Sequence, residues 1–237
     1  MAMSISVIIP TLNEERTIIA TLVHTATLGF DALIVVDGGS TDETPALVES
    51  YRLSTQSSAL SPVQWVTAPP GRARQMNEGA KASRGEVLLF LHADTQLPRD
   101  AKTLIDTTLA DRRMVGGRFD VQFDCPSMWG TIISRMMNRR SRLSGLATGD
   151  QALFVRRSVF EQMGGFADMP LMEDIEFSRR LNRAGATVAL TATVTTSFRR
   201  WEQQGPVRTI LLMWTLRFLN WVGVNPSHLA QWYKIIR

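Results

Sequence analysis

The stretch ISVIIPTLNEERTIIATLVHTATLGFDALIVVDGGS, residues 5–40, is the clearest guide to the architecture of this chain. Two apolar runs, 5–12 and 32–40, flank a segment whose apolar side chains recur at helical spacing. Short β-branched runs are typical of strands buried on both faces, and parallel strands need a helical crossover. The stretch therefore predicts a β-α-β unit, with Asn13 capping the helix and Gly29 ending it.

The same alternation continues along the chain. Further strands are predicted at 63–68 and 86–94, with helices at 41–53 and 71–83 and another helix beginning near Pro98. Strands that alternate with helices predict an α/β fold with a Rossmann-like, mostly parallel central sheet flanked by helices. In such sheets, ligands bind at the carboxyl ends of the strands. We therefore expect a site formed by the residues that follow each strand.

The second half of the chain has a different pattern. Residues 115–123 alternate apolar and polar side chains, which predicts a half-exposed strand in a small antiparallel element. A short strand at 152–157, helices at 158–166 and 172–185, and a last strand at 187–197 follow. We expect one domain over residues 1–200 and a C-terminal helical segment over 201–237.

Composition excludes several classes of protein. The chain has 237 residues, 44% of them hydrophobic, and a formal charge of +4, as expected for a globular protein without affinity for nucleic acid. Arginine outnumbers lysine, which suits phosphate recognition but is also what a G+C-rich genome produces. Cys125 is the single cysteine, so neither an internal disulfide nor a cysteine metal site can form. The start of the sequence lacks a basic signal-peptide region, and a cytoplasmic location is predicted.

Acidic residues lie at the ends of two predicted strands and at the start of one predicted helix. Asp37 begins a glycine-containing turn, Asp94 follows a buried strand, and Glu173 and Asp174 begin a helix. Asp94 suits Mg²⁺ or Mn²⁺ and diphosphate oxygens, because such ions prefer oxygen ligands. Each acid also has a structural explanation. An aspartate closes turns, and acids in a first helical turn stabilise the helix dipole.

Five linked segments carry a resemblance to a known family. In order and spacing they resemble the family 2 glycosyltransferases, which are inverting enzymes with the GT-A fold that use nucleotide-diphosphate sugars. The segments are VIIPTLNEE (7–15), VVDGGSTDET (35–44), RQMNEGAKASRGEVLLFLHADT (74–95), FVRRSVFEQMGGF (154–166) and MEDIEFSRRLNRAG (172–185). A narrower resemblance is to a small bacterial subgroup of transferases associated with arsenosugar biosynthesis or with radical-SAM enzymes.

The resemblance implies a role for each matching position. It implies a nucleotide-sugar site, a metal held by Asp94, catalysis by Asp174 with its neighbour Glu173, and an acceptor side. The residues implied for the nucleotide sugar are Pro10, Thr11, Glu14, Asp37, Gly38, Arg72, Arg74, His92 and Asp94. Those implied for the acceptor side are Asp150, Gln151, Arg200 and Trp201, and Asp150 and Gln151 lie where the family has either acceptor-side or donor-sugar contacts.

Two positions depart from the family pattern. His92 stands where the family usually has an aspartate. It could contact ribose or phosphate and shift the preference toward Mn²⁺, or simply be a packed residue at a strand end. Ser197 stands where processive relatives have glutamine, which favours a non-processive enzyme.

The C-terminal segment is the most apolar part of the chain. Residues 206–223 are interrupted by Arg208 and Arg217 and are marginal in length for a membrane span. We expect a helix packed on the domain or on a second subunit of a homodimer. An interfacial helix, peripheral at the inner face of a membrane, is the alternative.

Three functions remain at this point. The favoured one is metal-assisted, inverting and non-processive sugar transfer to a small-molecule or lipid acceptor, such as arsenosugar, glycoside or glycolipid synthesis. The second is a nucleotidyltransferase that forms nucleotide sugars. It would be expected to have a glycine- and lysine-bearing loop after the first strand, where this chain has TLNEERT. The third is a non-catalytic, partner-binding domain.

Overall fold

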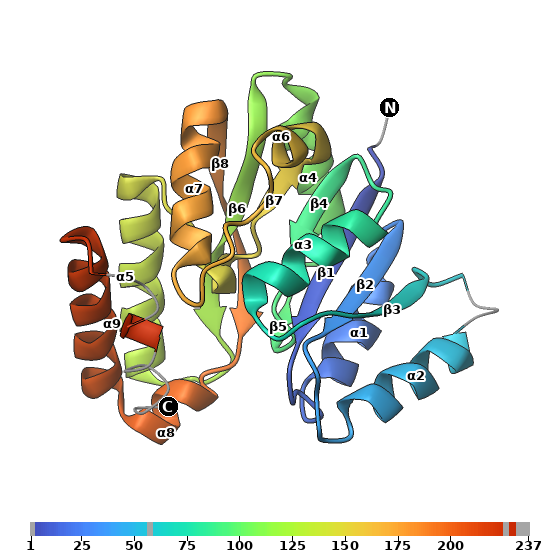
Figure 1. Cartoon of the computed structure of the whole chain (residues 1–237), viewed down its shortest axis with the longest axis horizontal. Coiled ribbons are helices and arrows are strands. Elements are labelled where there is room, and N and C mark those ends of the chain that lie inside the picture. Colours follow the sequence, from blue (N-terminus) through green and yellow to red (C-terminus); the bar gives the residue numbers. More distant parts are fainter. Residues whose placement is uncertain (1–2, 56–58, 225–227, 231–237) are drawn as a thin grey trace.

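The computed structural model describes residues 3–55, 59–224 and 228–230, without the side chains of Arg200, Asn220 and Trp221. Its centre is an eight-stranded sheet with the order β3-β2-β1-β4-β7-β6-β8-β5 (Figure 1). The strands are β1 Ile5–Thr11, β2 Ala32–Asp37, β3 Val63–Thr67, β4 Val87–Phe90, β5 Thr95–Gln96, β6 Met114–Phe123, β7 Phe154–Arg156 and β8 Ala186–Thr196. Residues 225–227 and 231–237 of the predicted C-terminal segment lie outside the described residues.

The strand pairing confirms a mixed, mostly parallel sheet. β1 pairs in parallel with β2 and with β4, and β2 pairs in parallel with β3. β7 then runs antiparallel to both β4 and β6, while β8 is parallel to β6. The parallel half agrees with the predicted β-α-β units, and β7 provides the predicted antiparallel element.

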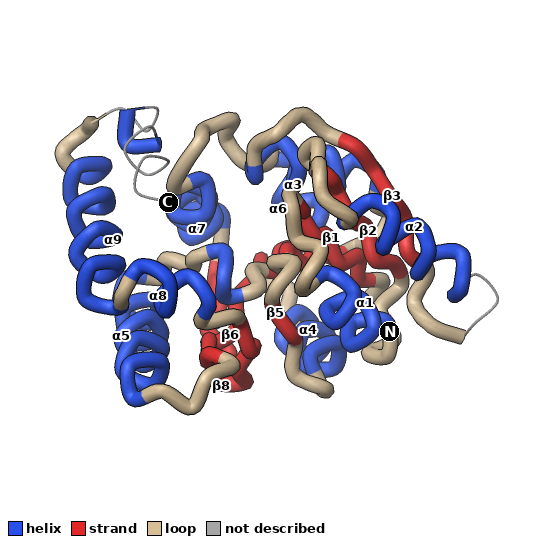
Figure 2. The backbone as a smooth tube through the Cα atoms, turned by 90° about the horizontal axis from the view of Figure 1, so that it is seen from below, coloured by secondary structure: helices blue, strands red, loops and turns tan. Residues whose placement is uncertain are grey.

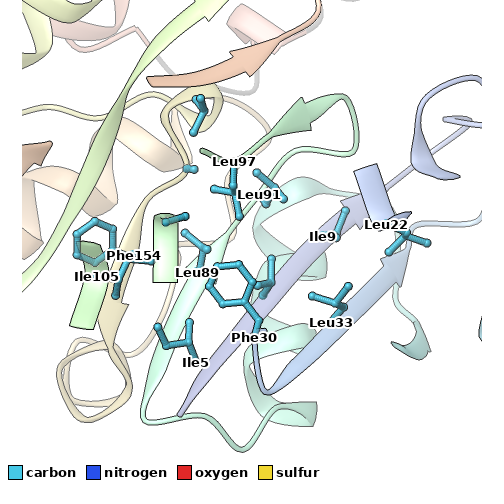
Figure 3. Packing of buried hydrophobic residues seen from close by; sticks show 14 of the residues in the cluster. Ile5, Ile9, Leu22, Phe30, Leu33, Leu89, Leu91, Leu97, Ile105 and Phe154 are labelled. Atoms are coloured by element: carbon cyan, nitrogen blue, oxygen red, sulfur yellow. The ribbon is translucent and has the colours of Figure 1, made fainter. Parts of the chain in front are cut away.

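Helices cover both faces of the sheet (Figures 1 and 2). They are α1 Ile18–Ala26, α2 Thr44–Thr55, α3 Arg72–Ala82, α4 Ala101–Ala110, α5 Met128–Ser144, α6 Arg157–Gln162, α7 Glu173–Ala184, α8 Arg199–Gln204 and α9 Pro206–Trp221. Alternate side chains of β1 divide between two cores. Ile9 belongs to a cluster that includes residues of α1 and α4 (Figure 3), and Ile8 belongs to another that includes residues of α3, α6 and α7. This alternation is the physical basis of the layered fold, because neighbouring side chains of a strand point to opposite faces.

The first helix begins later than predicted. It starts at Ile18, whereas Asn13 has a positive φ of 56° and does not cap it. The Asn13 side chain instead accepts a hydrogen bond from the Thr41 backbone N–H, 2.9 Å away. The Glu14 N–H donates in turn to the Thr44 hydroxyl at 2.9 Å. These bonds join the loops after β1 and β2, and that long-range pairing overrides the local capping signal.

Two strand predictions also need correction. The strand predicted over 86–94 ends at Phe90, so His92 and Asp94 lie in the loop that follows it. The half-exposed strand predicted over 115–123 is mostly buried in β6. Its side chains are covered because β6 lies between β7 and β8 in the sheet and α5 packs against it. Arg118 shows this well, since it is only 4% exposed and donates to the Ser141 carbonyl.

The C-terminal helix packs on the domain through one face. Leu216 of α9 is buried with Met172 and Ile175, which lie on either side of Glu173 and Asp174. Within the described ranges, no helix is both long enough and apolar enough to cross a membrane.

Candidate active site

The carboxyl ends of the central strands meet at one pocket. The β1–β2 register places Thr11 beside Asp37, and the β1–β4 register places Ile8 beside Phe90. An open hollow of about 360 Å³ lies at these ends. Its lining comes from the end of β1, the start of α3, the end of β4, the loop 147–149 and the start of α7, and includes Pro10, Arg72, Met76, His92, Gly149, Glu173 and Asp174. Segments far apart in the sequence therefore line one hollow, whereas Asp37 and Asp94 are not among its lining residues.

Asp174 is the most perturbed carboxylate of this pocket. It is half-buried in the first turn of α7, and its Oδ2 accepts the Gly149 backbone N–H at 2.8 Å. Burial raises the pKa of Asp174 to about 6, and the neighbouring Glu173 raises it too, whereas Arg72 and the backbone donors lower it. A carboxylate with this pKa is ionised near neutral pH yet is a better proton acceptor than an ordinary aspartate.

Glu173, the neighbour of Asp174, is more deeply buried and forms an ion pair with Arg72. It is 3% exposed, and its Oε1 lies 3.4 Å from Nη1 of Arg72 at the start of α3. A buried carboxylate needs such a partner because an unpaired charge in a low-dielectric site is costly. The ion pair places a guanidinium at the pocket rim and holds the Glu173 carboxylate against the start of α3, and a catalytic role of Glu173 stays a prediction.

The loop TGDQ, residues 148–151, lies between α5 and β7 in the chain and contacts both the loop after β4 and the start of α7. Its Asp150 Oδ1 lies 3.1 Å from Nδ1 of His92, while the Gly149 N–H is held by Asp174. Nε2 of His92 is buried and has no hydrogen-bond partner among the described residues. The contact of Nδ1 with Asp150 supports the loop-holding explanation of His92. Since His92 also lines the hollow and Nε2 has no partner among the described residues, a contact with ribose or phosphate stays a prediction.

The structure does not support the prediction that Gln151 contacts the acceptor. It is 0% exposed, and its Oε1 accepts the Thr148 N–H at 3.1 Å in a capping box. Its Nε2 donates to the Phe119 carbonyl at 3.3 Å. These bonds use both ends of the amide, so Gln151 holds the loop in place.

Replacing Gly149 by alanine is expected to destabilise this loop. An added Cβ would lie 2.3 Å from Nε2 of His92, so the ring would have to move away from Asp150. Overpacking of this kind costs about 1–3 kcal/mol, which urea unfolding would measure. Gly130→Ala is the matched control, because its added Cβ would meet nothing closer than 3.5 Å. If the clash is the cause, His92→Ala should restore most of the loss in the double variant, and equal effects of the two glycine substitutions would contradict it.

Asp94 is suited to a metal that the substrate helps to hold. It is half-exposed after β4, and its Oδ1 accepts one long hydrogen bond of 3.4 Å from the Thr95 hydroxyl. Among the described residues, no three His, Cys, Asp or Glu side chains are grouped to hold a metal by themselves. Mg²⁺ is commonly bound by one or two carboxylates together with substrate phosphates, and a single accessible aspartate fits that donor set.

Asp37 lies at the end of β2, outside the residues that line the hollow. It is 4% exposed, and its carboxylate accepts the N–H groups of Gly39 and Ser40, each at 2.9 Å. Gly38 packs closely on Gln75 of α3, whose amide donates to the Thr11 and Val36 carbonyls. The aspartate therefore organises the turn after β2, and its contact with a base stays a prediction.

The remaining predicted residues lie around this centre. Glu14 is half-buried and lies 3.4 Å from Nη2 of Arg199, which connects the loop after β1 to α8. Arg74 is exposed and forms a 2.8 Å ion pair with Asp168, outside the residues that line the hollow. Trp201 packs in an aromatic cluster with Phe123 and Phe198, and the Arg200 side chain lies outside the described part of the chain.

Sequence reasoning missed Arg140 of α5. Burial lowers its pKa, whereas the nearby Asp174 and Asp150 carboxylates raise it, and its Nη2 is buried without a partner among the described residues. Three non-glycine residues with positive φ were missed as well, namely Asn13, Ala152 and Met172. Each belongs to a segment that builds the site, where strained backbone tends to cluster. No periodicity distinguishes Arg140 from the other arginines of its helix, so the sequence carried no signal for it.

Comparison with known proteins agrees with the predicted fold. The chain is 26% identical to the probable glycosyltransferase YdaM of Bacillus subtilis (strain 168) over 261 aligned positions, covering 98% of this chain and 59% of YdaM. The chain thus spans about three fifths of that relative.

Solved structures share the architecture. Staphylococcus aureus TarS 1–349, in complex with UDP-GlcNAc, matches with a TM-score of 0.63 at 20% identity, covering 82% of this chain and 58% of TarS. The mannosyltransferase PcManGT from Pyrobaculum calidifontis, in complex with GDP-Man and Mn²⁺, matches with a TM-score of 0.62 at 21% identity, covering 92% and 65%. These likenesses confirm the predicted GT-A type of α/β fold.

Family membership follows from the sequence match itself. The profile described as glycosyl transferase family 2 matches residues 6–164, which hold β1 to β4, His92, Asp94 and the TGDQ loop. This match covers well over half of the chain, and the chain therefore belongs to the glycosyl transferase family 2.

Proposed function

We propose that this protein moves a sugar from a nucleotide-diphosphate sugar to an acceptor hydroxyl, with inversion at the anomeric carbon and without processive elongation. The observation that carries the proposal is Asp174, whose pKa is raised to about 6 beside the pocket at the carboxyl ends of β1 and β4. A poised carboxylate at that place is what proton removal from an attacking hydroxyl requires.

The donor would bind at the strand ends. Structural relatives bind UDP-GlcNAc in TarS and GDP-Man in PcManGT, which supports a nucleotide-diphosphate sugar as the donor here. Pro10 and Arg72 line the hollow, and the joined loops after β1 and β2 form its nucleotide side. Arg72 offers a guanidinium that can pair with diphosphate oxygens, because the two have matching fork geometry.

The chemistry uses the residues of this chain as follows. The acceptor oxygen approaches the anomeric carbon from the side opposite the nucleotide, and Asp174 takes its proton as the new C–O bond forms. The bond to the nucleotide diphosphate breaks at the same time and its electrons leave with the diphosphate. Gly149 holds the Asp174 carboxylate in place through its backbone N–H, and Glu173 stays paired to Arg72.

A divalent cation, Mg²⁺ or Mn²⁺, would be held by Asp94 together with the donor's own phosphates. When bound, it supplies positive charge that stabilises the departing diphosphate. His92 is left out of this proposed ligand set, because its Nδ1 faces Asp150 at 3.1 Å and its Nε2 is buried.

The acceptor would enter beside Asp150 of the TGDQ loop, whose side chain is 42% exposed. Ser197 in place of the glutamine of processive relatives supports a single transfer per encounter. The acceptor is a small molecule or a lipid, and an arsenosugar or another small glycoside stays a prediction from the narrower resemblance.

A thermal-shift panel of nucleotides with and without Mn²⁺ tests the proposal. A nucleoside diphosphate at 100 times its Kd should raise Tm by about 5–10 °C, because binding adds about 2.7 kcal/mol to the folded state. One base should be preferred, and Mn²⁺ should enlarge the shift. A preference for triphosphates with exchange of pyrophosphate would instead indicate the nucleotidyltransferase, and no shift with any nucleotide would indicate a non-catalytic domain.

A further inference from the structure

Helix α9 has a second apolar face that is exposed in the described part of the chain. Its inner side chains, including Leu216, pack against residues 171–175. The opposite side exposes a stripe of large apolar side chains at a spacing of three or four residues. The stripe consists of Val207 (54% exposed), Leu211 (61%), Trp214 (60%) and Phe218 (59%). Helical positions three and four apart lie on one face, so this stripe is continuous.

Helix α5 exposes a similar face. Met128 is 74% exposed and Leu143 is 79% exposed, with Trp129, Ile132 and Met136 exposed between them. Figures 1 and 2 place α5 and α9 at the same end of the molecule, away from α1 and α2. Exposed apolar side chains are common singly, but stripes on two neighbouring helices indicate a surface that binds something.

The charges on these two helices have one sign. α5 and α9 contain arginines but neither aspartate nor glutamate. Arg135, Arg139 and Arg208 are exposed. The acids nearest in sequence, Asp124 and Glu202, lie before α5 and in α8. A surface with arginines beside Trp, Phe and Leu is typical of helices that bind the interface of anionic membranes.

We propose that the outward faces of α5 and α9 bind the surface of an anionic lipid bilayer. A second copy of the chain is a poorer fit, because a two-fold interface through this surface would bring arginines against arginines without acids to pair them. α9 has 16 residues and is about 24 Å long, shorter than the roughly 30 Å of a hydrocarbon core, so it would lie on the membrane.

The location connects this surface to the pocket. α9 packs through its inner face on Met172 and Ile175, which flank the acids at the start of α7. Binding through the outer face would therefore place the pocket next to the bilayer. The inference goes beyond the proposed function, since it concerns only where the protein works.

Sedimentation of the full chain with vesicles tests the proposal. We expect binding to phosphatidylcholine vesicles that contain phosphatidylglycerol and at least tenfold weaker binding to phosphatidylcholine alone. The variant Val207→Ser/Leu211→Ser/Trp214→Ser should lose at least about 100-fold in affinity, because it removes most of the inserted apolar surface. Arg139→Gln and Arg208→Gln should each cost about fivefold, the change that about 1 kcal/mol per basic residue produces.

Controls separate docking from folding and from donor binding. The matched control is Val23→Ser/Leu53→Ser, which removes apolar side chains 48% and 55% exposed at the other end of the molecule and should bind vesicles normally. All variants should keep the Tm of the parent chain and its shift with nucleoside diphosphate. Equal sedimentation of the α9 variant and its control, or no binding to anionic vesicles, would overturn the proposal. A dimer that only the α9 variant loses, without vesicle binding, would assign the face to a second copy.

Discussion

Asparagine in place of Asp174 is expected to lower kcat by about 10²–10⁴-fold, the range that a positioned general base contributes. Asparagine keeps the size of the side chain and leaves an oxygen to accept the Gly149 N–H, so the loop should hold its shape. The loss should therefore fall on kcat, while the Tm shift with nucleoside diphosphate stays that of the parent chain. Steady-state kinetics with the identified donor measure it, and a variant with more than a tenth of the parent kcat would exclude Asp174 as the base.

The pH profile gives an independent check of the same residue. Because the base must be ionised, activity should fall as the pH drops through about 6, the raised pKa of Asp174, and level off above it. Glu173→Gln removes a negative charge that raises this pKa, so the acid limb should move to lower pH. Arg72→Gln removes a positive charge that lowers it, and the limb should move to higher pH.

Each of these two variants is a control for the other, because both break the same 3.4 Å ion pair between Arg72 and Glu173. A purely structural effect of breaking the pair would move the acid limb in the same direction in both variants. Opposite shifts would identify Asp174 as the titrating group, whereas an unchanged limb in both would show that another residue controls the profile.

Replacing Asp94 by alanine is expected to reduce kcat/KM by about 100-fold, as loss of roughly 3 kcal/mol of charge stabilisation by a metal would do. Asp94 is half-exposed and makes only the long bond from Thr95, so the fold should tolerate the change. The measurement is activity as a function of Mn²⁺ concentration, together with the Mn²⁺-dependent part of the nucleotide Tm shift. Both should be lost in the variant.

Asp100→Ala is the matched control for this result. Asp100 is an exposed aspartate six positions later, and its side chain makes no capping hydrogen bond to α4. It should keep the metal response of the parent chain. If Asp94→Ala retains that response as well, the metal has no role at this position and the charge on the diphosphate must be met by residues such as Arg72.

Local pattern predicted the elements of the parallel half and the place of the site. The runs of buried apolar residues at 5–11 and 32–37 are long enough to be read without tertiary context, and their ends bring Thr11 and Asp37 into register. The residues alone already suggested Asp94 as a metal ligand, and the family resemblance added the general-base role of Asp174, which its position otherwise leaves as a helix-dipole residue. Sequence-based predictions were wrong where a residue distant in sequence overrode a local preference. Asn13 is an example, because its side chain accepts a hydrogen bond from the Thr41 N–H and does not cap the helix.

The amino-acid order by itself was sufficient for the alternating architecture and for the acids at the strand ends, because these depend on periodicity and on turn residues close in the chain. The surroundings of these residues were decided only by the tertiary structure. It buried Glu173 against Arg72, raised the pKa of Asp174, and turned His92 toward Asp150. It also buried Gln151 in a capping box and placed Arg140 near Asp174. Burial and charge proximity arise between residues far apart in sequence, and no local pattern encodes them.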